Sequence, residues 1–404
     1  MIFVGVDWAE IRHDVCVLDR AGEVLARKKI PDTIEGARTL HELLAPYVEE
    51  PDEVLVGIEK DRGLIVTAML GAGYRVYALN PMSVARYRER HVTSGSKSDP
   101  GDAKVLADVV RTDRHNHREA AGDSEGADAL KVLARAHQSA IWNRQREMNA
   151  LRNALVNYYP GALAAFGTDL DDGDAVEILA IAPTPARGAQ LSLATITSAL
   201  RRGGRQRNLE RTAKRIQAAL RAEQLHERPR VELAYGKIAA AHVAMIRAYS
   251  DTITELEAAL AQDFEQHPDA KIVRSLPGLG MVLGARVLGE FGDDPNRYAD
   301  AKSRRNYAGT SPVTRASGKS KVVLARHARN SWLGAAADQW AFCSLKRSPG
   351  ARAYYDELRA RGKTHRRAIR QLANRWVGIL HVCLERRVFY DENLAWKHRV
   401  DIAA

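Results

Sequence analysis

The sequence is poor in cysteine and has no long apolar run. Its three cysteines, Cys16, Cys343 and Cys383, are odd in number and lack the spacing of metal ligands, which indicates a reducing compartment and no zinc site. No stretch of 18 or more apolar residues occurs, so we expect no ordinary membrane-spanning helix. Asp7 interrupts the first apolar run and no basic segment precedes it, so no signal peptide is expected. These absences predict a cytoplasmic protein.

Positive charge, in contrast, is in excess. The 404 residues include 61 Lys and Arg against 50 Asp and Glu, a formal net charge of +11, in a chain whose composition is otherwise that of a globular protein of two or three domains. Residues 301–330 hold eight Lys or Arg and no acid, and basic residues recur at 363–367. This excess favours a nucleic-acid partner. We predict nucleic-acid contacts at Arg304, Arg305, Arg315, Lys319, Lys321, Arg326, Arg329, Arg366 and Arg367.

The first 120 residues alternate between strand and helix patterns. Three apolar or alternating segments, at 2–7, 13–19 and 23–30, predict a meander of strands, and two further strands are expected at 53–59 and 74–80. Helical spacing at 33–48 and 64–70 separates these later strands. The pattern predicts an α/β domain over 1–120, with a mixed sheet flanked by helices. If this sheet is ribonuclease-H-like, its first and fourth strands lie side by side.

Beyond this domain the patterns are helical. A long amphipathic helix with partial heptad spacing begins near Asp123 and ends at Pro160-Gly161, and a second ends at His267-Pro268. We predict a coiled-coil connector over 121–270, packed as a helical hairpin or serving as a dimer stalk, with an irregular insertion near 161–235. Residues 271–404 should form a mainly helical third domain.

Four carboxylates form the candidate metal site. Asp7 and Glu59 each end an apolar strand, and Asp99 and Asp102 lie three residues apart at a helix start, on one helix face. Taken alone, the aspartate pair is better explained as a helix cap favoured by the macrodipole than as a metal site. Together the four carboxylates would repel one another without a cation between them, and oxygen ligands suit Mg²⁺ or Mn²⁺. We therefore predict a Mg²⁺ (or Mn²⁺) site.

Motifs at both ends of the chain resemble the DEDD transposases of the insertion-sequence 110 family. The N-terminal motifs are residues 3–9 (FVGVDWA), 58–59 (IE), 78–81 (ALNP) and 97–103 (KSDPGDA). The C-terminal motifs are residues 276–280 (LPGLG) and 307–318, with Gly309, Pro312 and Ser317-Gly318. The resemblance covers about 1–115 and 271–385.

This resemblance implies a Holliday-junction-resolvase-like domain joined through a coiled coil to a serine-bearing domain. It implies that Asp7, Glu59, Asp99 and Asp102 are the metal ligands, and that Ser317 is the nucleophile that joins a DNA 5′-phosphate. The expected partners are donor and target DNA, a structured non-coding bridge RNA and further copies of the chain, in a homodimer or homotetramer in the bacterial cytosol or nucleoid, without a membrane.

Two other interpretations stay open. Before the resemblance is considered, the Ser-Gly pair favours a turn residue at Ser317, and Ser311 and Ser320 are equally eligible as nucleophiles. The chain would then be a metal-only Holliday-junction resolvase or nuclease in which water attacks. A non-catalytic nucleic-acid-binding protein that kept the fold is the third possibility.

Overall fold

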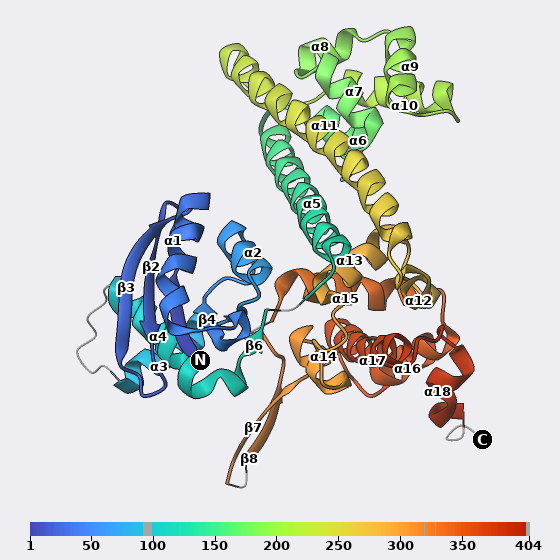
Figure 1. Cartoon of the computed structure of the whole chain (residues 1–404). Coiled ribbons are helices and arrows are strands. Elements are labelled where there is room, and N and C mark those ends of the chain that lie inside the picture. Colours follow the sequence, from blue (N-terminus) through green and yellow to red (C-terminus); the bar gives the residue numbers. More distant parts are fainter. Residues whose placement is uncertain (92–98, 121, 319, 328, 401–404) are drawn as a thin grey trace. The chain divides into compact units, whose positions relative to one another are not determined.

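The computed structural model describes residues 1–91, 99–120, 122–318, 320–327 and 329–400, which fall into two compact units, 1–122 and 123–404 (Figure 1). The description does not extend to the side chains of residues 91, 99, 100, 118 and 398–400. The predicted mixed sheet and the mainly helical remainder are both confirmed. No helix among the described residues is long and apolar enough to cross a membrane.

A mixed sheet of six strands forms the centre of the first unit, in the order β3-β2-β1-β4-β5-β6. The parallel pairs are β1 with β4 and β4 with β5, and the other neighbours are antiparallel. The sequence had indicated all of these strands except the two-residue β6. Their bounds are β1 (Ile2–Asp7), β2 (Arg12–Leu18), β3 (Val24–Pro31), β4 (Val54–Ile58), β5 (Arg75–Ala78) and β6 (Arg118–Glu119).

Helices cover both faces of this sheet. Alternate residues of β1 enter two separate apolar clusters: Val4 and Val6 pack in one that includes residues of α1 and α2, and Phe3 packs in another that includes residues of α4. The helices are α1 (Ile34–Leu44), α2 (Leu64–Gly71), α3 (Pro81–His91) and α4 (Asp99–Asp113), with 3₁₀ turns at Ala45–Tyr47, Pro51–Glu53 and Arg114–Asn116.

Two glycines let α4 lie directly on the sheet. Gly5 of β1 and Gly57 of β4 are register partners on adjacent strands. A Cβ added at Gly5 would lie 1.8 Å from the carbonyl oxygen of Ala103, and one at Gly57 would lie 2.5 Å from that of Leu106. Backbone therefore contacts backbone here, and this fixes the position of the first turns of α4 along the two strands.

Two long helices dominate the first half of the second unit. Helices α5 (Glu125–Tyr158) and α11 (Pro229–Gln266) run antiparallel along each other (Figure 1). Polar contacts cross their interface from His137 to Glu257 and from Arg144 to Ser250. The two predicted long helices are therefore present as an antiparallel pair.

The segment between them is not irregular, as the sequence had suggested, but helical. Five short helices, with a core of their own against α5 and α11, replace the expected irregular insertion. Asp172, Thr184 and Ser192 cap three of them through side-chain hydrogen bonds to backbone N–H groups. The helices are α6 (Pro160–Phe166), α7 (Gly173–Ile181), α8 (Pro185–Gln190), α9 (Leu193–Arg202) and α10 (Leu209–Arg221).

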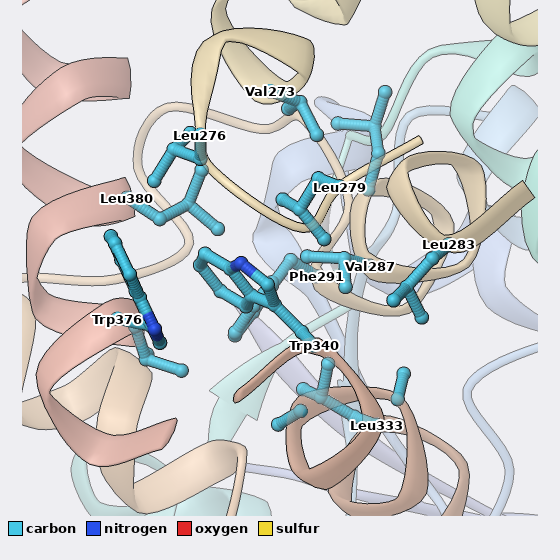
Figure 2. Packing of buried hydrophobic residues seen from close by; sticks show 14 of the residues in the cluster. Val273, Leu276, Leu279, Leu283, Val287, Phe291, Leu333, Trp340, Trp376 and Leu380 are labelled. Atoms are coloured by element: carbon cyan, nitrogen blue, oxygen red, sulfur yellow. The ribbon is translucent and has the colours of Figure 1, made fainter. Parts of the chain in front are cut away.

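The C-terminal part packs its helices around two tryptophans. The fully buried rings of Trp340 and Trp376 stack with centroids 5.6 Å apart, among leucines of the surrounding helices (Figure 2). A hairpin of β7 (Val313–Ser317) and β8 (Ser320–Leu324), which the sequence had not indicated, interrupts the helices. The helices are α12 (Ala270–Ser275), α13 (Met281–Phe291), α14 (Ala301–Tyr307), α15 (Ser331–Ser344), α16 (Pro349–Ala360), α17 (His365–Arg386) and α18 (Glu392–Val400).

Candidate active site

Three of the four predicted carboxylates line one open pocket of about 950 Å³ in the first unit. Val6 and Ile58 are register partners on the parallel strands β1 and β4, so Asp7 and Glu59 follow at the same edge of the sheet. Asp102, in the first turns of α4, also lines this pocket. The gathering of Asp7, Glu59 and Asp102 thus results from strand register and from the glycine contacts that fix α4.

Asp102 is buried and paired with an arginine. Its Oδ1 lies 2.7 Å from Nη2 of Arg88, a residue of α3 that lines the same pocket. This pair could not be predicted from the sequence, because Arg88 is one of several basic residues in its helix and nothing local marks its partner. Asp99 is the first residue of α4, but its side chain lies outside the described residues.

The carboxylate set suits a hard divalent cation, although it is not arranged around one. Among the described side chains, no group of three or more His, Cys, Asp and Glu lies close enough to hold a metal ion. The pocket nevertheless brings together carboxylate oxygens from three separate elements, and these are the ligands that Mg²⁺ and Mn²⁺ prefer. The residues present therefore fit such an ion by their chemistry.

Cationic groups accompany the carboxylates in this region. Lys29 lies 3.2 Å from Asp14, which lines the pocket, and Lys60, directly after Glu59, places its Nζ 2.6 Å from the centroid of the Trp8 ring. Burial lowers the pKa of Lys60, with the nearby positive charge of Arg62 acting in the same direction. Mixed charge of this kind can receive both a cation and an anionic phosphate.

Ser317 lies in the second unit, as the last residue of β7. It faces Ser320 across the tip of the hairpin, where Gly318 takes a left-handed φ of +54° in the turn. The Ser317 side chain is exposed, as are Arg315 and Lys321 on the same hairpin. Lys319, predicted to contact nucleic acid, lies outside the described residues. Ser317 therefore ends a strand next to the turn and is accessible there.

One predicted nucleic-acid contact needs correction. Arg304 is only 7% exposed, and its guanidinium carbon lies 4.6 Å from the ring centroid of Tyr298 and 5.2 Å from that of Phe291. Burial lowers its pKa. Arg304 packs inside the C-terminal core because its flat guanidinium stacks on aromatic rings, so it does not offer a surface contact to phosphate.

The other predicted basic residues differ in exposure. Arg366 and Arg367 are exposed at the start of α17, whereas Arg305, Arg326 and Arg329 are half-buried. Arg326 contacts Asn306, and Arg329 lies 3.7 Å from Asp338. The exposed members are thus concentrated on the hairpin and at the start of α17.

Comparison with known proteins gives the family. A family model described as "Transposase", of the DEDD type named for IS110, matches residues 4–160, and one described as "Transposase IS116/IS110/IS902 family" matches residues 270–356. The "Mini-circle putative transposase for IS117" of Streptomyces coelicolor is 43% identical over 100% of this chain and 98% of that protein.

Two further relatives are more distant. The "Insertion element IS110 uncharacterized 43.6 kDa protein" of Streptomyces coelicolor is 28% identical over 97% of this chain and 96% of its own length. The "Insertion element IS900 uncharacterized 42 kDa protein" of Mycobacterium paratuberculosis is 26% identical over 96% of this chain and 97% of its own length. The chain therefore belongs to the IS110 family of insertion-sequence transposases, which are enzymes that act on DNA.

Proposed function

We propose that this transposase cuts and rejoins DNA by combining the carboxylates of the first unit with the serine of the second. The observation that carries the proposal is the pocket shared by Asp7, Glu59 and Asp102. Ser317 supports it, because an exposed hydroxyl at a hairpin tip can approach a phosphate without displacing a core residue. In this view the sheet is of the ribonuclease-H-like, resolvase-like type and α5 and α11 form a coiled coil.

The carboxylates hold Mg²⁺, or Mn²⁺ in its place. Asp7, Glu59 and Asp102 would be ligands together with Asp99, which precedes Asp102 by one helical turn. The ion, when bound, supplies positive charge that offsets the charge developing on the phosphate. Arg88 pairs with the Asp102 carboxylate and satisfies its charge where α4 buries it as long as no ion is bound.

Ser317 acts as the nucleophile. Its Oγ forms a bond to the phosphorus of one phosphodiester while the bond from phosphorus to the 3′ oxygen breaks, and the serine proton goes to that leaving oxygen. The product is a 5′-phosphoserine ester and a free 3′ hydroxyl. A 3′ hydroxyl from another strand then attacks the ester and restores the serine, so the number of phosphoester bonds is conserved. Arg315 and Lys321, both exposed near Ser317, offset the phosphate charge.

We infer that a structured bridge RNA chooses the sites. Base pairing between this RNA and donor and target DNA would supply sequence choice, while basic side chains hold backbones, so that the protein needs few base contacts. Two duplexes must be held together during exchange, and a homodimer or homotetramer built through the helical middle would do this. The expected division of the chain is 1–120 for the carboxylates, 121–270 for the connector and 271–404 for the serine.

The test uses two serines on one hairpin. Ser320 is the cross-strand neighbour of Ser317 and is also exposed, so Ser320→Ala is a matched control for Ser317→Ala. Each full-length variant is incubated with Mg²⁺, DNA carrying the element ends and the element's RNA, and covalent protein–DNA adducts are separated under denaturing conditions. We expect the adduct with the wild type and Ser320→Ala, and none with Ser317→Ala.

Cleavage by Ser317→Ala at the wild-type rate would instead assign the attack to water, as in a metal-only resolvase. Asp102→Asn should abolish cleavage while DNA binding is retained, because the change removes a metal ligand but no contact to the DNA backbone. Recombination in cells that survives Asp102→Asn would identify a non-catalytic binding protein.

A further inference from the structure

A second pocket lies at the base of the hairpin that carries Ser317. It has a volume of about 500 Å³, and its walls come from Leu324 and neighbouring hairpin residues and from the first turns of α17. Three arginines of α17, Arg366, Arg367 and Arg370, line it. None of the lining residues, all of them in the described part of the chain, is acidic. The pocket is therefore strongly cationic.

The surrounding charges do not neutralise it. Asp338 lies near the arginines without lining the pocket, and its pKa is raised by burial although the positive charges of Arg329, Arg370 and Arg366 oppose this. Its Oδ2 lies 3.7 Å from Arg329. One carboxylate thus faces several guanidinium groups. In addition, Nε of Arg370 is buried without a hydrogen-bond partner among the described residues. The charges near this pocket leave room for an added anion.

The arrangement also opposes helix stability. The first turn of α17 holds no acid, and its arginines lie at the end of the helix where the macrodipole is positive. Cations there raise the free energy of the folded protein unless an anion offsets them. A cluster that costs stability when empty and gains it when an anion binds is typical of a binding site.

Neutral groups complete the lining. The hydroxyls of Thr310 and Ser311 lie 3.2 and 3.4 Å from Oδ1 of Asn374. Because this oxygen accepts both hydrogen bonds, the NH₂ group of Asn374 points away from the two hydroxyls. Thr310 and Asn374 both line the pocket. Guanidinium and amide N–H donors together match the oxygens of a phosphodiester.

The hairpin sets the distance from this pocket to Ser317. Val313 pairs with Leu324 at the base and Ser317 with Ser320 at the tip, four residues further along. At roughly 3.4 Å per residue this is about 14 Å. Because one strand of B-form DNA winds around the axis as it advances about 3.4 Å per nucleotide, phosphates about two nucleotides apart are separated by roughly this distance in a straight line.

We propose that this pocket binds one backbone phosphate of the DNA strand that Ser317 attacks, about two nucleotides from the cleaved bond. The proposal rests on the proposed function of Ser317. Its ligand is a phosphodiester, recognised by Arg366, Arg367 and Arg370 without regard to sequence. The hairpin then measures the distance between a fixed phosphate and the reacting one.

The first experiment measures binding by full-length variants. Arg366→Gln removes an exposed guanidinium from the pocket, and Arg386→Gln removes the same charge from the last turn of the same helix, outside the pocket. Affinity for a labelled duplex DNA and for a labelled bridge RNA is measured over a range of KCl concentrations. Arg366→Gln should weaken DNA binding about tenfold or more. For this variant the magnitude of the slope of log affinity against log salt concentration should decrease by about 0.9.

The outcomes distinguish a specific DNA pocket from general charge attraction and from RNA binding. Arg386→Gln should keep both the affinity and the slope of the wild type, and the melting temperature of Arg366→Gln without nucleic acid should be unchanged or higher. Equal losses for Arg366→Gln and Arg386→Gln would overturn the pocket, because they would report general charge alone. A loss confined to RNA would assign the pocket to RNA and would also overturn the proposal.

The second experiment changes the DNA and reads the distance from the wild-type protein, with Arg366→Gln as the control. Once the cleaved bond is mapped from the adduct, single phosphates of the attacked strand are replaced one at a time by neutral methylphosphonates. Wild-type affinity should drop at about the second phosphate from the cleaved bond, and Arg366→Gln should show no further drop there. Equal sensitivity at every position would overturn the distance. If Ser317→Ala still cleaves DNA, the proposed function fails, whereas failure of the pocket is read only from these binding measurements.

Discussion

The contact of α4 with the sheet gives the sharpest prediction, Gly5→Ala. The change adds one methyl group, which would lie 1.8 Å from the carbonyl oxygen of Ala103 and 2.5 Å from the backbone nitrogen of Ala107. Ordinary contact begins near 3.4 Å, so helix and strand must separate by about 1.6 Å. Neither obstacle is a flexible side chain that could rotate away. The helix must therefore shift as a unit.

The size of the effect follows from what that shift disrupts. Overpacking a well-packed core costs about 1–3 kcal/mol, and obstruction by backbone on both sides places Gly5→Ala at about 3 kcal/mol or more. Since Asp102 is on the displaced helix, its carboxylate moves relative to Asp7. A displacement of about 1 Å in a catalytic group can cost about 100-fold in rate. We expect cleavage to fall by at least that factor in the fraction that stays folded.

Denaturant unfolding and single-turnover cleavage measure the two effects, with two other glycines for comparison. Gly57→Ala should be milder than Gly5→Ala, because its nearest obstacle is 2.5 Å away. Gly71, at the end of α2, has no heavy atom within 4 Å of an added Cβ, so Gly71→Ala should be neutral or slightly stabilising. A Gly5→Ala protein as stable and active as Gly71→Ala would refute the reasoning.

Two more predictions concern charge. Arg88→Gln removes the guanidinium that contacts Asp102 and that would compete with a cation there. The Mg²⁺ concentration needed for half-maximal cleavage should therefore fall. A rise would show instead that Arg88 mainly positions the carboxylate. Burial lowers the pKa of His137, against the opposing effect of Glu257, so the unfolded chain takes up its proton first as pH falls below about 6.5. The free energy of unfolding should therefore decrease from pH 7.5 to 5.5. In parallel thermal melts, His137→Gln should show a smaller decrease than the wild type. Identical pH dependence in the two proteins would contradict this role of His137.

The first unit was the more predictable from sequence, for a physical reason. Its signals are local: apolar runs that end at Asp7 and Glu59 indicate buried strands, and strand alternation gives the faces of the sheet. The meeting of these two residues also follows once β1 and β4 are paired in parallel. The contact of Gly5 and Gly57 with α4 is different, since a glycine in a strand signals close approach but does not name its neighbour.

The second unit was less predictable, because its decisive contacts are between distant residues. Arg304 belongs to a basic stretch that is typical of an exposed surface, yet the rings of Tyr298 and Phe291 pack against its guanidinium. The inserted helices α6–α10 are short, and mixed Gly, Pro and Asp obscured their periodicity, although Asp172, Thr184 and Ser192 are usable cap signals. The hairpin β7–β8 carries no buried face, so the alternation that marks a strand is missing.

The exposed hairpin has a consequence for how Ser317 is positioned. Nine of its ten strand residues are exposed, and an isolated two-stranded hairpin is marginally stable in water. Asp102, by contrast, is buried on a helix that the sheet holds in place. The accuracy of the proposed attack must therefore come largely from the bound DNA. A phosphate held by Arg366 and Arg370 at the hairpin base would fix the strand relative to Ser317, so changes there should slow adduct formation even when DNA is saturating.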